Sequence, residues 1–245
     1  MLVICNGMPR SASTWSFNVA AGLLKPAEGG PPLRTGYSDD PDHFLAMAAA
    51  DEGDTVLKCH ALTPKIAALS SSGTAKLIYT IRNIADAAVS FMAVFHVDFD
   101  HAIAVMDASL HTLAVHRGAG RALILDYNDI ANQPDAAAAR IAAYLGRSIP
   151  RARLVEVAAE TSLARMRAKV PSSEDAAVAG RLIQHGGTFY DPATLLNIGH
   201  IRDGTQGAGK RTLQPAQIQR IAALLGRYGL TEELQPVGCN ARLSY

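Results

Sequence analysis

Five side chains, spread widely along the sequence, have the types needed to bind an anion and to accept a proton beside it. Arg10, Lys58 and Arg82 are cations, His60 belongs to the residue type that titrates near neutral pH, and Tyr127 carries an aromatic ring. A histidine suits general-base chemistry, and the guanidinium group of arginine presents a planar fork of donors that fits phosphate oxygens. Together these residues would suit a site that holds a phosphate-containing ligand next to a base.

The segment Asn6–Trp15 is the first of these regions, and it lies between a short apolar run and a helix-forming stretch. A strand, a turn of small residues and a helix can bind phosphate, because turn amides and the helix N-terminus converge on one anion. The spacing resembles the Walker A loop, with Gly7 and Thr14 at its ends, but Ala12 replaces the second Gly and Ser13 replaces the Lys. We therefore expect a phosphate site that is not an ordinary ATP or GTP site; a plain strand-to-helix turn is the alternative.

The elements that must position these residues follow from the apolar patterning. Apolar runs predict strands at residues 2–5, 54–60, 76–81 and 122–127. Helix-forming or amphipathic segments predict helices at residues 15–24, 44–50, 64–69, 84–95, 102–116, 135–145, 150–159 and 215–228. Asn83 should cap the helix that follows it, and Gly146 should end another. Residues 25–42 and 171–211 are predicted to be surface loops, the second a long loop or lid.

Strands separated by helices imply parallel βαβ units, so the expected fold is an α/β three-layer sandwich around a central, mostly parallel sheet. Ligands of such sheets bind beyond the carboxyl ends of the strands. Each of the five polar residues lies at or just after a predicted strand end, and we therefore expect them to meet at one edge of the sheet. Lys58 and His60 should also share a face, because residues i and i+2 of a strand do.

The composition limits the class of protein. The chain has 245 residues, 49% of them hydrophobic and 18% charged, with a net charge of +1, which argues for one globular domain over 1–245 and against nucleic-acid binding. Three widely spaced cysteines, no apolar run of membrane-spanning length and no signal peptide predict a cytoplasmic protein that does not enter membranes. The histidines lack zinc-ligand spacing, and no carboxylate cluster suggests Mg²⁺, so no metal is expected.

Three segments resemble those of one enzyme family, the sulfotransferases that use 3′-phosphoadenosine 5′-phosphosulfate (PAPS). Residues Pro9–Trp15 resemble the family's P-K-S-G-T-T-W loop, which cradles the 5′-phosphosulfate. Residues Lys58–His60 are similar to the K-T-H segment that carries its catalytic base. Residues Lys76–Phe91 are similar to its 3′-phosphate segment, K-x-I-Y-x-x-R-N-x-x-D-x-x-V-S.

Weaker similarities continue in the same order through the rest of the chain. Residues Asp126–Asp129 resemble the family's Y-E-D strand end, and Leu145–Arg147 its G-R/K pair. Thr161–Met166 follow its T-S-F-x-x-M pattern and Arg202–Lys210 its R-K-G-x-x-G-D-W-K pattern. The differences are Ala12 in place of Gly, Leu163 in place of an adenine-contacting Phe and Asp203 in place of Lys.

The resemblance implies a P-loop-NTPase-like sulfotransferase fold and a role for each matching residue. His60 would be the base, Lys58 would stabilise the transition state, and Arg10 would hold the 5′-phosphate and the sulfate. The remaining cofactor-binding residues that it implies are Ser11, Ala12, Ser13, Thr14, Trp15, Arg82, Ser90, Tyr127, Thr161, Leu163, Arg202 and Gly204, with Arg82 and Ser90 on the 3′-phosphate. The implied cofactor is PAPS, with adenosine 3′,5′-bisphosphate (PAP) as product and no metal.

The leading hypothesis is thus a sulfotransferase that acts on a hydroxyl group of a small molecule. A P-loop kinase of a small metabolite is the first alternative, and a nucleotide-binding scaffold without activity is the second. The acceptor and the oligomeric state do not follow from the sequence. The stretch 91–99 could line an acceptor pocket, but an aromatic stripe is more often core, so no site residue is assigned there.

Overall fold

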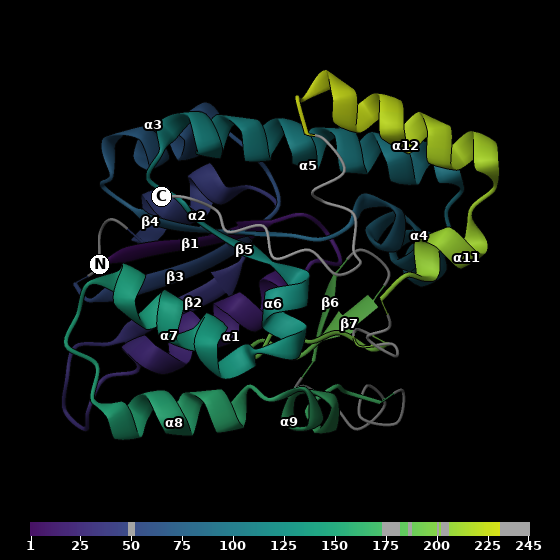
Figure 1. Ribbon diagram of the computed structural model, residues 1–245. Coiled ribbons are helices and arrows are strands. Elements are labelled where there is room, and N and C mark those ends of the chain that lie inside the picture. Colours follow the sequence, from purple (N-terminus) through teal and green to yellow (C-terminus); the bar gives the residue numbers. More distant parts are fainter. Residues whose placement is uncertain (49–51, 173–181, 186–187, 200, 202–205, 231–245) are drawn as a thin grey trace.

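A parallel sheet of five strands forms the centre of the computed structural model, which describes residues 1–48, 52–172, 182–185, 188–199, 201 and 206–230 (Figure 1). Its strands are β1 (Leu2–Gly7), β2 (Leu33–Tyr37), β3 (Asp54–Cys59), β4 (Lys76–Ile81) and β5 (Leu123–Asp126). They lie in the order β2-β3-β1-β4-β5, and every neighbouring pair is parallel. The predicted α/β fold with a parallel central sheet is confirmed.

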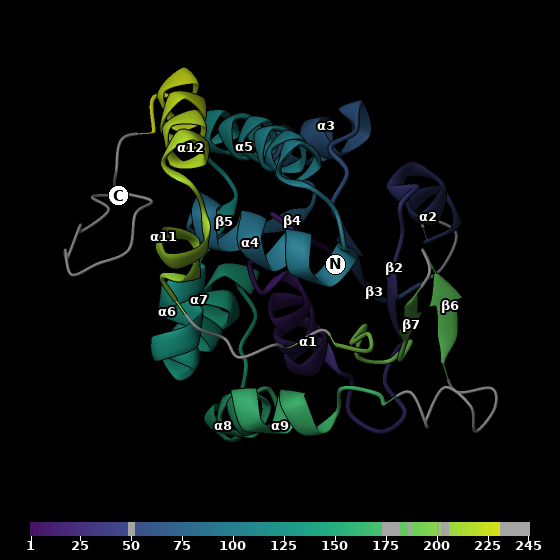
Figure 2. The ribbon, with the colours of Figure 1, turned by 90° about the vertical axis from the view of Figure 1, so that its right-hand side faces the viewer.

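Helices cover both faces of this sheet, which explains why its inner strands are apolar on both sides. Helices α1 (Ser13–Leu24), α7 (Pro134–Leu145) and α8 (Arg151–Glu160) pack on one face. Helices α3 (Pro64–Ser72), α4 (Ile84–Phe95), α5 (Phe99–Ala119) and α12 (Pro215–Arg227) pack on the other. Figure 2 shows α3, α5 and α12 above the strands and α1, α7 and α8 below them. The helices that follow β1 and β3 therefore pack on opposite faces of the sheet. The position between two such strands is a topological switch point, which is where open α/β sheets bind ligands.

Local end signals set several of these helices. The side chain of Asn83 accepts a hydrogen bond from the amide of Asp86 at 3.0 Å and caps α4, as predicted. Gly146 ends α7 in the left-handed conformation, also as predicted. Thr63 caps α3 in the same way as Asn83 caps α4, by accepting from the amide of Ile66 at 3.2 Å. The start of α4 is therefore specified locally, and this start places Arg82 and Ser90.

One prediction is wrong: residues 25–42 are not only a loop, because they contain edge strand β2 and the start of helix α2 (Pro41–Ala48). Every residue of β2 is only partly buried, so it lacks the apolar run that identifies an inner strand. Gly36 is needed within it, since a Cβ atom there would lie 2.8 Å from the ring of Phe44. The prolines and glycines before β2 obscured a strand that depends mainly on pairing with β3.

Two short helices were also not predicted. Helix α6 (Tyr127–Asn132) begins at Tyr127, so this residue does not end β5 as expected; Asp126 caps α6 by accepting from the amide of Asn128 at 2.7 Å. Helix α9 (Leu163–Ala168) follows α8 after a turn at Thr161 and Ser162. Both helices are only six residues long, too short for an amphipathic pattern to be visible.

Within the predicted loop 171–211, the described residues include regular structure. Strands β6 (Ile183–His185) and β7 (Thr188–Tyr190) form an antiparallel pair, and helix α11 (Ala208–Thr212) packs on α4. Residues 173–181, 186–187, 200 and 202–205 lie outside the described part, so the predicted lid is not tested. None of the described helices is both long enough and apolar enough to cross a membrane.

Candidate active site

A cavity of about 400 Å³ opens at the carboxyl ends of β1 and β3, where the sequence predicts the site. Six of the expected residues line it: Arg10, Ala12, Ser13, Thr14, Lys58 and His60. Residues that were not expected complete the lining: Pro9, Tyr37, Phe91, Phe95, Val105, Tyr190, Leu195 and Asn197. The cavity is therefore polar where the strand-end loops reach it and largely apolar over the rest of its wall.

The loop between β1 and α1 forms the polar side of this cavity. Its residue Ser11 is fully buried, and the Ser11 hydroxyl lies 2.6 Å from the carbonyl oxygen of Met8 and 2.7 Å from the hydroxyl of Thr80. A Cβ atom on Gly7 would lie 2.3 Å from the same Thr80 oxygen, so only glycine lets β1 and β4 approach this closely. The Ser11 side chain thus anchors the loop to β4, a contact that the sequence did not suggest.

The loop ends in a left-handed residue, Ala12, with φ of 72°. The Cβ atom of an alanine makes this conformation costly, by about 1–2 kcal/mol, whereas glycine adopts it freely. No side chain caps the N-terminus of α1, and Ser13 and Thr14 of its first turn face the cavity. The first amides of the helix and its dipole are therefore directed at the space where an anion would sit.

Lys58 and His60 lie side by side, as their spacing predicts. The Lys58 ammonium is 3.1 Å from Nε2 of His60, and Nδ1 of His60 is 2.7 Å from the carbonyl oxygen of Gly7. A carbonyl oxygen can only accept, so Nδ1 carries the proton. Nε2 is then unprotonated, and its lone pair accepts from Lys58 while lining the cavity. This is the tautomer that a general base needs.

The electrostatics of this pair favour a neutral imidazole. Burial, and next the charge of Lys58, lower the pKa of His60 to about 3. Burial lowers the pKa of the Lys58 ammonium to about 8, and the charge of Arg10 contributes in the same direction. At neutral pH His60 is therefore unprotonated, with a lone pair free to accept a proton, and Lys58 is a cation that a bound anion would stabilise.

The two arginines and Ser90 form a second group directly behind the loop. Nε of Arg10 donates to the hydroxyl of Ser90 at 3.1 Å, and Nη1 of Arg82 donates to the backbone oxygen of Arg10 at 3.3 Å. The Arg82 guanidinium also stacks on the ring of Tyr127, 4.1 Å from its centroid. Arg82 and Ser90 do not line the cavity themselves. They are nearly buried beside it, so the expected 3′-phosphate residues adjoin the expected 5′-phosphate residue.

Among the expected cofactor-binding residues, Trp15 and Thr161 are in contact. The indole Nε1 of Trp15 donates to the backbone oxygen of Thr161 at 3.0 Å, which ties α1 to the turn between α8 and α9. Leu163, at the start of α9, is one of the more exposed large apolar residues, with 51% of its surface accessible.

Arg202 and Gly204 lie outside the described residues, but the chain just after them is fixed. The carboxylate of Asp86, on α4, accepts from the amides of Gly207 at 2.7 Å and Gly209 at 2.8 Å and is 2% exposed. Gly209 packs so closely that a Cβ atom there would lie 2.3 Å from Cβ of Ala85. Asp86 was visible in the R-N-x-x-D pattern, yet its partners are more than 120 residues away.

Several residues of the site carried no usable sequence signal. Tyr37 comes from the unpredicted strand β2, and Tyr190 and Leu195 from the predicted loop 171–211. Phe91 and Phe95 share one side of α4, with ring centroids 4.5 Å apart, and both line the cavity. Spacing alone could not distinguish such a pair from ordinary core.

Comparison with known proteins assigns the chain to a protein family. The sequence profile of the sulfotransferase domain matches residues 34–228, whereas no curated protein sequence matches the chain. The mouse sulfotransferase SULT7A1 complexed with PAP is similar in structure, with a TM-score of 0.64 at 14% identity over 93% of this chain and 84% of the other. Retinol dehydratase in complex with androsterone and PAP has a TM-score of 0.61 at 14% identity over 98% and 82% of the two chains. Its complex with retinol and PAP gives 0.57, also at 14% identity, over 93% and 80%.

Proposed function

Because the chain belongs to the sulfotransferase domain family, we propose that it transfers the sulfuryl group of PAPS to a hydroxyl group of a small apolar molecule, with His60 as the general base. The observation that carries this proposal is the hydrogen-bond geometry of His60, which implies its tautomer. Its Nδ1 is held by the Gly7 carbonyl, so that unprotonated Nε2 lines the cavity next to the Lys58 ammonium.

The residues present fit a cofactor with phosphates at two positions. Arg10 lies at the loop and the uncapped N-terminus of α1, which together suit the 5′ side. Arg82 and Ser90 lie behind Arg10 and suit a second phosphate. When bound, PAPS supplies the sulfuryl group and leaves as the bisphosphate PAP. The same bisphosphate is bound in the mouse sulfotransferase and in the retinol dehydratase that share this fold.

The chain's own contribution is to position an acceptor and to move its proton. An acceptor hydroxyl that replaces the Lys58 ammonium at Nε2 of His60 donates its proton there, and the imidazole is neutral at any ordinary pH. Lys58 has a flexible four-carbon stem, so its ammonium can turn from Nε2 toward negative charge that grows beside Arg10. Transition-state stabilisation in this site thus rests on cations and on orientation.

The apolar part of the cavity lining favours an apolar acceptor. The rings of Phe91, Phe95 and Tyr190, with Val105 and Leu195, line the same cavity as His60. Apart from Arg10, Lys58 and His60, no titratable side chain other than the tyrosines lines the cavity among the described residues. A neutral, largely apolar alcohol or phenol is therefore the acceptor class that this wall fits. Retinol dehydratase, which shares the fold, binds retinol and androsterone.

The test is a mass-spectrometric assay for sulfated products, with purified protein, PAPS and a panel of neutral alcohols and phenols beside charged ones. We expect sulfation of apolar members that depends on PAPS, proceeds without metal and is lost in the variant His60→Ala. Phosphate transfer from ATP and Mg²⁺ to the same panel would overturn the proposal in favour of a kinase. Binding of PAP without turnover of any acceptor would favour a scaffold.

A further inference from the structure

Tyr37 lies beside the catalytic pair, although it comes from the edge strand. In the parallel pairing of β2 with β3 it stands opposite Lys58, and the amide of the next residue, Ser38, donates to the Lys58 carbonyl at 3.1 Å. The Lys58 ammonium lies 4.7 Å from the centroid of the Tyr37 ring, within the range of a cation–π contact. The same ring lies 6.2 Å from that of His60.

The surroundings of Lys58 make this contact important. The side chain is only 6% exposed, and among the described residues no carboxylate forms an ion pair with it. Its close polar partners are the neutral imidazole of His60 and the face of the Tyr37 ring. Arg10 repels it, while Asp39 and any ionised form of Cys5 or Cys59 would favour its charge. Burial raises the pKa of both thiols to about 12, so they remain neutral.

We propose that Tyr37 is a positioning residue, whose ring keeps the Lys58 ammonium charged and held beside the cavity. A cation removed from water needs compensation, and an aromatic face provides it without neutralising the charge. A carboxylate in this place would bind Lys58 more tightly, but it would compete with the cofactor anion for it. The ring leaves the charge available. The inference rests on the proposed function for its catalytic meaning, but its physical content concerns only Tyr37 and Lys58.

The hydroxyl of Tyr37 has a separate task. It donates to the carboxylate of Asp39, two residues on, which holds the ring in place. Burial and this hydrogen bond raise the pKa of Tyr37, so the phenol stays neutral and is not a base. The ring and the hydroxyl can therefore be tested separately: Tyr37→Phe removes the hydroxyl alone, whereas Tyr37→Met keeps an apolar side chain but removes the aromatic face.

The experiment is a titration of Lys58 by NMR in protein whose lysines carry ¹³C at Cε, without cofactor or acceptor. The chain has six lysines, so the spectrum is simple, and Lys58→Met identifies the signal. We expect a midpoint of about 8 in the wild type, nearly the same in Tyr37→Phe, and about one pH unit lower in Tyr37→Met. An equal midpoint in the Phe and Met variants would overturn the proposal.

Trifluorinated phenylalanine at position 37 serves as a second variant in case Tyr37→Met does not fold. It keeps the shape of the ring but withdraws electron density from its face, so it should also lower the midpoint relative to Tyr37→Phe; no difference would again contradict the proposal. In the sulfation assay, Tyr37→Met should lower kcat about tenfold with unchanged PAP affinity, and Tyr37→Phe should restore it. Suppose that the Lys58 midpoint differs between Tyr37→Phe and Tyr37→Met as expected, but the protein has no sulfotransferase activity. That result would refute the proposed function and leave the Tyr37–Lys58 contact established.

Discussion

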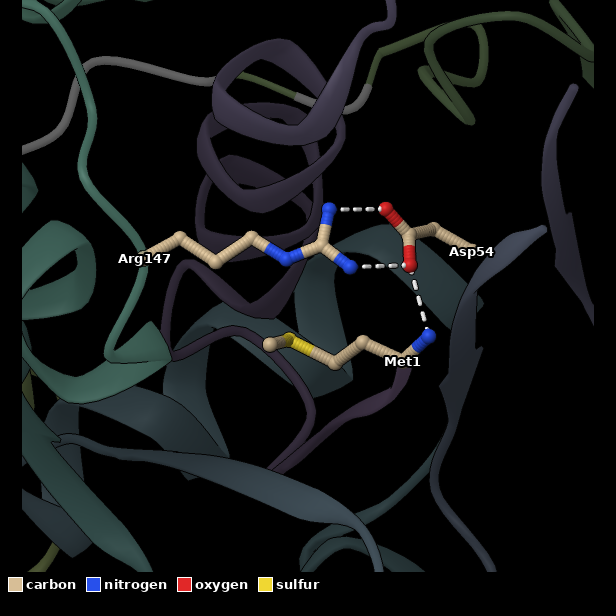
Figure 3. A network of polar contacts seen from close by, with 3 residues as sticks. All are labelled: Met1, Asp54 and Arg147. Atoms are coloured by element: carbon tan, nitrogen blue, oxygen red, sulfur yellow. Dashed lines mark hydrogen bonds and ion pairs between the residues drawn. The ribbon is translucent and has the colours of Figure 1, made fainter. Parts of the chain in front are cut away.

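Strand β3 has a charged residue near each end, and the two charges have opposite surroundings. At its start, Asp54 accepts from the terminal ammonium of Met1 at 2.6 Å and from both terminal nitrogens of Arg147, at 2.5 and 2.7 Å (Figure 3). At its other end, the printed partners of Lys58 among the described residues are neutral, the His60 imidazole and the Tyr37 ring, with the charges of Arg10 and Asp39 nearby. One end is a network of opposite charges, whereas the other holds a buried cation beside a second cation at the cavity.

The difference separates a charge that the fold pairs from one that the fold leaves without an opposite partner among the described residues. Burial alone would raise the pKa of Asp54, yet the hydrogen bonds from Met1 and Arg147 hold it below its usual value, so the folded state favours the ionised form. At Lys58 the effect of burial on the pKa exceeds that of the nearby charges, so the folded state without a ligand disfavours the charged form. Substitutions at the first end should therefore affect stability, and substitutions at the second should affect activity.

The largest effect is expected at His60. His60→Ala should lower turnover by about 10²–10⁴-fold, the usual contribution of a positioned base, while PAP affinity stays nearly constant because Arg10, Arg82 and the loop amides remain. Arg10→Ala is the matched control and should weaken PAP binding and turnover together. Calorimetry and initial rates give the two quantities. Wild-type turnover in His60→Ala would place the base elsewhere.

Arg82 should decide the preference for a 3′-phosphate. Loss of one charge-assisted contact costs about 1.5–3 kcal/mol, or roughly 10–150-fold, so Arg82→Ala should reduce the ratio of PAP to AMP affinity by that factor. Arg82→Lys keeps the charge without the planar fork, so its ratio of PAP to AMP affinity should lie between those of the wild type and Arg82→Ala. Competition calorimetry measures both. A wild-type protein that binds AMP as tightly as PAP would remove the assignment of Arg82 and Ser90.

The pH profile tests the charge states of His60 and Lys58. For the free enzyme, kcat/KM should be flat from about pH 5 to 7, because His60 is already neutral there, and should fall about tenfold per unit above the Lys58 pKa of about 8. Lys58→Arg should move the alkaline limb upward, even if its rate is lower, since arginine stays protonated. An acid limb near pH 6.5 would indicate an imidazole that titrates normally.

Lys58 should also lower the stability of the ligand-free protein. Its folded-state pKa lies below the unfolded value, so the penalty is full below about pH 8 and disappears as the pH rises toward 10.5. Lys58→Met should therefore raise the free energy of unfolding at pH 7 by about 1–2 kcal/mol while activity is lost. Chemical denaturation at pH 7 and pH 10 checks the sign. Destabilisation at pH 7 would show that Lys58 is a structural charge after all.

The smallest effect is expected at the opposite end of the strand. Asp54→Asn should lower the free energy of unfolding by about 1 kcal/mol at pH 7, because Arg147 is half exposed and solvent weakens the pair. The depressed pKa of Asp54 means that this contribution is present above the unfolded pKa and is lost as pH falls through the folded one. The difference in the free energy of unfolding between Asp54→Asn and the wild type should thus disappear at acid pH. Sulfation activity should not change.

Much of this arrangement was accessible from the sequence, because its signals are local. The inner strands are continuous apolar runs, and the N-cap at Asn83 and the C-cap at Gly146 are set by residues within one turn. Lys58 and His60 meet because they are two residues apart at the end of a strand. The parallel order of the strands then brings Arg10 and Arg82 to the same edge.

What the tertiary structure alone decided involves partners far apart in the chain. Strand β2 exists because β3 offers it an edge, and only that pairing places Tyr37 at Lys58. Ser11 bonds to β4 through Thr80, and Asp86 holds Gly207 and Gly209. Side-chain types and periodicity describe what a segment can bury, but not which distant backbone groups need a partner. Those pairings form only when the sheet and its helices pack.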